Sequence, residues 1–165
     1  MNLVKGDLLE MAEAGHFDVI VQGCNCFCTM NSGLAGQIRN KYPQAYQADC
    51  VTTKGDPKKL GEFTVAQTEK FTIVNAYTQF DYNKKGRAFQ DRFEYQAFEQ
   101  VLNRLYERMV WSKTPRRFGF PMIGMGLAGG DKNRIIAQLE EFARQVEAVG
   151  GSVTLVEYAG SFQGI

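Results

Sequence analysis

Histidine is nearly missing from this chain, which has one among 165 residues. A metal site or catalytic site that requires two or three imidazoles is therefore excluded. A clear excess of either charge is missing too, because 19 Lys and Arg residues are balanced by 18 Asp and Glu residues. A net charge of +1 is too small to hold a polyanion by its overall field, so a phosphate ligand would have to be bound by local geometry.

Long apolar runs are also missing, and no stretch has the length of a signal peptide or a membrane span. We find no internal repeats and no Pro/Ser-rich linkers. The length fits one domain, so we expect a single domain over residues 1–165 and a cytoplasmic monomer that does not bind membranes. The four cysteines, Cys24, Cys26, Cys28 and Cys50, fit free thiols in a reducing compartment. Their spacing matches no usual zinc site, so we expect neither a metal nor a cofactor.

Strand and helix patterns alternate along the chain. Strands are expected at 2–5, 17–22, 62–67, 71–77, 118–122 and 153–158, and helices at 8–14, 34–42, 92–111 and 131–149, with a further helical stretch after Pro43. A short Thr-Glu-Lys turn separates the strands at 62–67 and 71–77 and predicts an antiparallel hairpin. The pattern predicts an α/β fold of three layers, in which helices cover both faces of a mixed, mostly parallel sheet of about six strands.

Two of the expected strands end in glycine-containing loops that each lead into a helix. The first loop, GCNCFCTMNSG, follows FDVIVQ, and the second, IGMGLAGG, follows RFGFPM. Ligands of such sheets bind at the carboxyl ends of the strands, where glycine backbones and helix N-termini present N–H groups to phosphates. We interpret the two loops as a cradle for a diphosphate, although glycine also serves turns for purely conformational reasons. Neither loop has the spacing of a P-loop or of a Rossmann turn.

These segments resemble the macrodomains, a family that binds ADP-ribose. KGDL is similar to the family's Gly-Asp-Ile/Leu motif, VQGCN to its Val-Asn-Ala-Ala-Asn motif, and NSGLAGQI and PMIGMGLAGGD to its two phosphate loops. The resemblance implies that Asp7 accepts a hydrogen bond from the adenine amino group, beside Leu8 and Tyr158. It implies that Asn25, next to Gly23, contacts the distal ribose. It places the diphosphate along Gly33, Leu34, Ala35, Gly124, Met125, Gly126, Leu127 and Ala128.

The CNC segment and the following G-L-A-x-x-I-x-x-K-Y-P are similar to macrodomain branches that process ADP-ribose 1″-phosphate or remove ADP-ribose from modified targets. The resemblance implies a metal-independent hydrolase that acts at the distal ribose. The leading hypothesis for its substrate is ADP-ribose 1″-phosphate, which would yield ADP-ribose and phosphate. Removal of ADP-ribose from a modified protein or nucleic acid is the alternative. The other alternative is a reader that binds ADP-ribose without catalysis, which is favoured by Ala128 where one hydrolase branch has an aspartate.

Asn25 and Asp131 are the candidate catalytic residues. The carboxamide of Asn25 can fix ribose hydroxyls as both donor and acceptor, and no cap or turn partner is evident for it in the sequence. Asp131 would orient and deprotonate a water. Asp131 and Asp7 each precede an expected helix, where a capping role is the structural alternative. Tyr158 can likewise be half-buried sheet surface, and no lysine nucleophile is assigned to the loop that contains Lys84 and Lys85.

Overall fold

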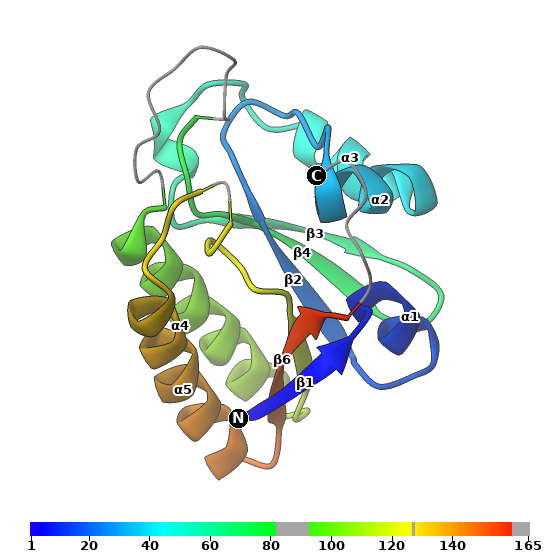
Figure 1. Ribbon diagram of the computed structural model, residues 1–165, viewed down its shortest axis with the longest axis vertical. Coiled ribbons are helices and arrows are strands. Elements are labelled where there is room, and N and C mark those ends of the chain that lie inside the picture. The colour runs from blue at the N-terminus through cyan, green and yellow to red at the C-terminus, as the bar shows by residue number, and fades with distance from the viewer. Residues whose placement is uncertain (82–92, 127, 160–165) are drawn as a thin grey trace.

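A six-stranded sheet forms the middle layer of the protein (Figure 1). The computed structural model describes residues 1–81, 93–126 and 128–159. The strand order is β1-β6-β5-β2-β4-β3, and every neighbouring pair is parallel except β3 and β4. The strands are β1 (Asn2–Gly6), β2 (Val19–Cys24), β3 (Phe63–Gln67), β4 (Thr72–Tyr77), β5 (Arg117–Phe120) and β6 (Ser152–Tyr158). The expected mixed, mostly parallel sheet and its hairpin are thus confirmed.

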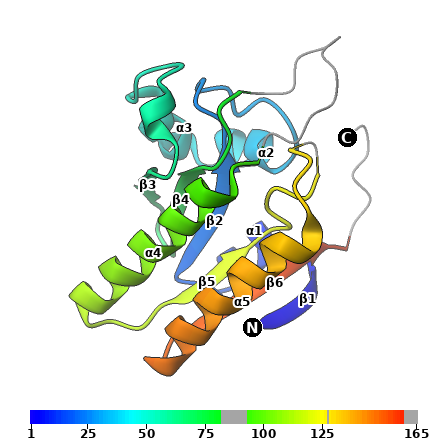
Figure 2. The same ribbon diagram turned by 90° about the vertical axis from the view of Figure 1, so that its left-hand side faces the viewer.

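Helices cover both faces of this sheet. On one face lie α1 (Leu8–Glu13), α2 (Gly33–Lys41) and α3 (Pro43–Cys50), and on the other lie α4 (Tyr95–Ser112) and α5 (Lys132–Ala148), as Figures 1 and 2 show from two directions. A short 3-10 helix, η1 (Pro57–Lys59), follows α3. The three-layer α/β prediction is confirmed. None of the helices in the described part of the chain has the length and apolar character needed to cross a membrane.

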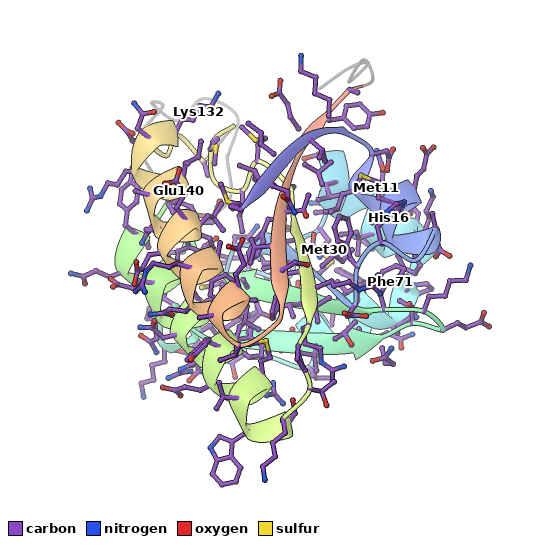
Figure 3. All side chains as sticks on the ribbon, turned by 90° about the horizontal axis from the view of Figure 1, so that it is seen from below. Met11, His16, Met30, Phe71, Lys132 and Glu140 are labelled. Atoms are coloured by element: carbon purple, nitrogen blue, oxygen red, sulfur yellow. The ribbon has the colours of Figure 1, made fainter. Side chains whose placement is uncertain are left out.

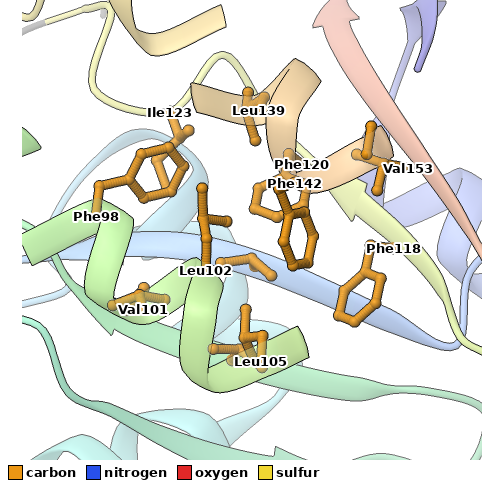
Figure 4. Close-up of a cluster of buried hydrophobic side chains, with 14 of the residues drawn as sticks. Phe98, Val101, Leu102, Leu105, Phe118, Phe120, Ile123, Leu139, Phe142 and Val153 are labelled. Carbon is orange, nitrogen blue, oxygen red and sulfur yellow. The ribbon is translucent and has the colours of Figure 1, made fainter. Parts of the chain in front are cut away.

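The alternation of side chains along the central strands explains why both faces are covered. Val19 and Val21 of β2 belong to the core under α4 and α5, whereas Ile20 belongs to the core under α1, α2 and α3. Aromatic rings fill the first of these cores (Figure 4), and Phe118 and Phe142 pack edge to face with their centroids 5.2 Å apart. In Figure 3, side chains fill the space between the layers, while Lys132 and Glu140 project outward from α5.

Several element boundaries differ from the sequence prediction. The strand expected at 17–22 runs to Cys24, so Gly23 lies inside β2 and pairs with Ala76 instead of belonging to the loop. The strand expected at 118–122 ends at Phe120, because the next residue, Pro121, has no N–H to donate to a neighbouring strand. The helix expected from Asp131 begins one residue later, since the side chain of Asp131 caps it. The helix expected at 92–111 begins at Tyr95, and residue 92 lies outside the described residues.

Candidate functional site

Two cavities lie at the carboxyl edge of the sheet. The Asn25 cavity has a volume of about 290 Å³ and is lined by Gly23, Cys24, Asn25, Thr29, Met30, Asn31, Ser32, Ala35, Asp49, Gln79 and Ala128. The Asp7 cavity has a volume of about 50 Å³ and is lined by Gly6, Asp7, Leu8, Leu34, Gln37, Pro121, Val156 and Tyr158. Leu34 and Ala35 are neighbours in the first turn of α2, and each lines one cavity. The N-terminus of α2 therefore joins the two cavities.

The Asp7 cavity is built by the pairing of β1 with β6. The strand register sets Gly6 opposite Tyr158, which brings the tyrosine beside Asp7 and Leu8. Asp7 caps α1, because its Oδ1 accepts a hydrogen bond from the backbone N–H of Glu10 at 3.1 Å. The cap uses one of the two carboxylate oxygens. Asp7, Leu8, Leu34 and Tyr158, which were predicted from distant segments, are thus brought together around one cavity.

The side chain of Asn25 organises the first glycine loop. Its Oδ1 accepts a hydrogen bond from the backbone N–H of Phe27 at 2.8 Å, and its Nδ2 donates to Oγ1 of Thr29 at 2.8 Å. The expectation that Asn25 lacks a turn partner is therefore wrong, because the amide closes a turn of its own loop. Asn25 nevertheless lines the cavity beside Gly23 and Ala128, and its contact with the distal ribose stays a prediction.

The first loop is held in an unusual backbone shape by buried groups. Cys28 and Met30 have positive φ angles of 58° and 44°, which L-residues adopt at a cost of about 1–2 kcal/mol each. The carbonyl of Cys26 accepts hydrogen bonds from the backbone N–H of Gly55 at 2.7 Å and from Nζ of the buried Lys59 at 3.0 Å. These contacts fix the loop before a ligand arrives.

The second glycine loop closes on itself above the first. Gly124 has a φ of 75°, and its carbonyl accepts a hydrogen bond from the N–H of Gly130 at 2.8 Å. The loop brings Ala128 to the wall of the Asn25 cavity. Leu127 lies outside the described residues. The second loop has three other predicted diphosphate contacts, Gly124, Met125 and Gly126. None of these three residues lines either cavity.

Asp131 lies apart from the Asn25 cavity. Its Oδ1 accepts a hydrogen bond from the backbone N–H of Arg134 at 3.0 Å, and its own N–H donates to the hydroxyl of Tyr95 at 2.8 Å. The residue is exposed and lines neither cavity. Asp131 therefore has the capping role that was the alternative to catalysis, and its catalytic role stays a prediction.

Sequence reasoning did not name five polar residues of the Asn25 cavity. Three belong to the first glycine loop, Thr29, Asn31 and Ser32, and two lie outside it, Asp49 and Gln79. Asp49 is 1% exposed, and its Oδ1 accepts a hydrogen bond from the hydroxyl of Tyr77 at 2.8 Å. Burial raises the pKa of this carboxyl, while the Tyr77 hydrogen bond and the charge of Lys59 oppose the rise. The signal was available, because Asp49 lies four residues after the buried Ala45 and thus on the inner face of α3.

Cys24 and Cys26 are poor nucleophiles. Cys24 and Cys26 are buried, and burial raises the pKa of the Cys26 thiol to about 11 and that of Cys24 well above its usual range. Both thiols are therefore neutral at physiological pH and pack as small apolar groups. Among residues 1–81, 93–126 and 128–159, no three His, Cys, Asp or Glu side chains gather as a metal site would require.

A three-layer fold with a two-cavity cleft along the carboxyl edge of its sheet is an α/β binding fold. The profile of the Macro domain family matches residues 21–139, and the chain belongs to this family. It is 32% identical over 151 residues to an uncharacterized 17.5 kDa protein from the tk-vs intergenic region of Enterobacteria phage T4, and the match covers 88% of this chain and 92% of that protein.

Solved structures show the same fold. The macrodomain of Thermus aquaticus DarG superposes with a TM-score of 0.67 at 21% identity, and the match covers 96% of this chain and 97% of that one. A Trypanosoma brucei macrodomain in complex with ADP-ribose gives a TM-score of 0.65 at 13% identity, over 94% of this chain and 62% of that one. Macrodomains are thus the fold neighbours of this protein, and at least one of them binds ADP-ribose.

Proposed function

We propose that this chain binds ADP-ribose across the two cavities and hydrolyses a derivative of ADP-ribose at its distal ribose. The adenine would occupy the Asp7 cavity, where Leu34 and Tyr158 supply apolar surface and Asp7 supplies an acceptor. The distal ribose would occupy the Asn25 cavity, whose lining includes the polar side chains of Asn25, Thr29 and Gln79. The Trypanosoma brucei macrodomain supports this choice of ligand, because its structure holds ADP-ribose.

The observation that carries the proposal is the N-terminus of α2 between the two cavities. Ser32 is the N-cap residue of this helix, and its side chain makes no capping hydrogen bond. Among the described residues, the N–H groups of the first turn therefore lack a capping side chain, at the point where a diphosphate would cross from one cavity to the other. This arrangement binds a dianion without cationic side chains, which agrees with the near-zero net charge of the chain.

Two classes of derivative fit hydrolysis at the distal ribose. One is ADP-ribose 1″-phosphate, which would yield ADP-ribose and phosphate, and the other is ADP-ribose attached to a protein or a nucleic acid. In both, Asn25 would hold the ribose, and its turn fixes the direction of its amide. Asp131 stays a candidate base with less support, because it lies outside the lining of the Asn25 cavity.

The test is to offer the purified chain ADP-ribose 1″-phosphate and ADP-ribosylated protein and DNA, and to measure released phosphate and released ADP-ribose. We expect turnover of at least one substrate and its loss in Asn25→Ala. Asn40→Ala is the matched control, because Asn40 is an exposed residue near the end of α2. Asp131→Asn retains a capping side chain, so loss of turnover without loss of stability would support its role as a base. Absence of turnover on every substrate would refute hydrolysis.

A non-catalytic reader of ADP-ribose is the second candidate, and one observation favours it. The amide of Asn25 is engaged within its own loop, and Asp131 is engaged as a helix cap. Calorimetric binding of ADP-ribose, together with inactivity on all three substrates, would establish the reader.

A further inference from the structure

The side chains that line the Asn25 cavity have an unusual charge balance. None of its eleven described lining residues is Lys, Arg or His. One of them, Asp49, is a carboxylic acid. The nearby thiol of Cys24 is neutral, because burial raises its pKa well above the usual range. The only formal charge among the described lining residues is therefore the negative charge of the Asp49 carboxylate.

The charge of Asp49 is only partly compensated. The hydroxyl of Tyr77 donates to its Oδ1 at 2.8 Å. The cation whose charge acts on Asp49 is Lys59 of η1, whose Nζ donates to the carbonyl of Cys26 at 3.0 Å and lies 4.8 Å from the centre of the Tyr77 ring. Lys59 forms no salt bridge within 4 Å of Asp49 in the described part of the chain. Several titratable groups interact with the carboxylate of Asp49 through charge or hydrogen bonding. They are Cys24, Cys26, Tyr46, Lys59 and Tyr77.

This setting differs from the N-terminus of α2, which favours anions. The diphosphate would lie at the helix N-terminus, whereas a group attached at C1″ would lie deeper, in the cavity that Asp49 lines. A carboxylate accepts hydrogen bonds from O–H and N–H groups, and it repels a second anion. At an effective dielectric constant of about 20, like charges several ångströms apart repel strongly enough to change an affinity about tenfold or more.

We propose that Asp49 determines which group the site accepts at C1″, and that this group is a neutral adduct with an O–H or N–H donor instead of a phosphate. The inference rests on the proposed function, because it takes the distal ribose to lie in the Asn25 cavity. It assigns the substrate class to ADP-ribose joined at C1″ to an uncharged group. Asp49 is then a specificity-determining residue that disfavours ADP-ribose 1″-phosphate.

The test compares two ligands that differ in charge at C1″. Calorimetry measures the binding of ADP-ribose and of ADP-ribose 1″-phosphate at about pH 8, because an alkaline pH favours the ionised form of a carboxyl whose pKa is raised by burial. Phosphate is assayed at the end of each titration to correct for turnover. We expect the wild type to bind ADP-ribose about tenfold more tightly. In Asp49→Asn, we expect weaker binding of ADP-ribose and tighter binding of the 1″-phosphate, so that the preference falls to about twofold or less.

Changes of opposite sign distinguish charge selection from structural damage, because a loosened cavity would weaken both ligands. Asp56→Asn is the matched control, since Asp56 caps η1 nearby but does not line the cavity, and it should retain the wild-type preference. If Asp49→Asn does not fold, the wild-type preference decides, and equal or tighter binding of the 1″-phosphate overturns the proposal. Parallel weakening of both ligands in Asp49→Asn overturns it as well. Failure of the wild type to bind either ligand would instead refute ADP-ribose binding, and the role of Asp49 would fall with it.

Discussion

The two glycine loops look alike in sequence, but their glycines serve different physical needs. In the second loop, a Cβ added at Gly124 would lie 2.4 Å from Cδ1 of Phe93, and one added at Gly130 would lie 2.6 Å from Cδ1 of Ile135. In the first loop, a Cβ at Gly33 would meet no atom of the described residues within 4 Å, although its φ of 58° is unfavourable for other residues. The second loop thus uses glycine for close packing, and the first uses it for backbone direction.

This difference separates a loop that is part of the core from a loop that faces a ligand. Gly124 and Gly130 let the second loop pack directly on Phe93, which precedes α4, and on Ile135 of α5, so its position is set by the core. Gly33 starts α2 at the junction of the two cavities, where open space remains above the backbone. A glycine-rich motif therefore predicts close backbone approach without specifying whether the neighbour is protein or ligand.

The largest effect on stability is expected for Gly124→Ala. The substitution combines an unfavourable φ of 75° with a clash against Phe93, so we expect a loss of about 3 kcal/mol in the free energy of unfolding. Urea denaturation measures this loss. An unchanged unfolding midpoint would contradict the packing role of the second loop.

A smaller effect is expected for Gly33→Ala. Only the backbone conformation opposes this change, which should cost about 1–2 kcal/mol of stability. If the first turn of α2 holds the diphosphate, the same variant should also bind ADP-ribose about tenfold more weakly, because the N–H groups would turn away from it. Denaturation and calorimetry on one sample separate the two effects. A destabilised variant with wild-type affinity would contradict the ligand-facing role of the first loop.

The smallest effect on stability is expected for Gly126→Ala. This glycine belongs to the second loop, but an added Cβ would meet nothing within 4 Å and its φ is not in the left-handed range. We expect a change of less than about 0.5 kcal/mol in the free energy of unfolding. Gly126→Ala is thereby the matched control for Gly124→Ala. A loss comparable to that of Gly124→Ala would show that the whole loop, and not one packed position, requires glycine.

Sequence patterns predicted the layers of the fold because the underlying signals are local. Strands such as β2 and β4 are short runs of buried β-branched residues, and α4 and α5 carry apolar residues at helical spacing. The family resemblance assigned Asp7, Leu8 and Tyr158 to one end of the ligand, and the pairing of β1 with β6 does bring them around one cavity, although their contact with adenine stays a prediction.

The parts of the site that were missed depend on contacts between distant segments. Asp49 becomes a cavity residue only when α3 packs against the end of β4, where the hydroxyl of Tyr77, 28 residues away, reaches it. The turn around Asn25 was missed for a different reason. Its partners, Phe27 and Thr29, are close in sequence, but the loop adopts this shape under contacts with Gly55 and Lys59, which lie far along the chain.

The pairing of β1 with β6 also has a consequence for synthesis on the ribosome. β1 is an edge strand whose sole neighbour is β6, the last strand in chain order. A growing chain therefore exposes Asp7 and Leu8 early but cannot enclose them until residues 152–158 have left the exit tunnel. The Asn25 cavity, whose described lining ends at Ala128, can be assembled sooner. The Asn25 cavity and the Asp7 cavity would thus be completed at different times during translation.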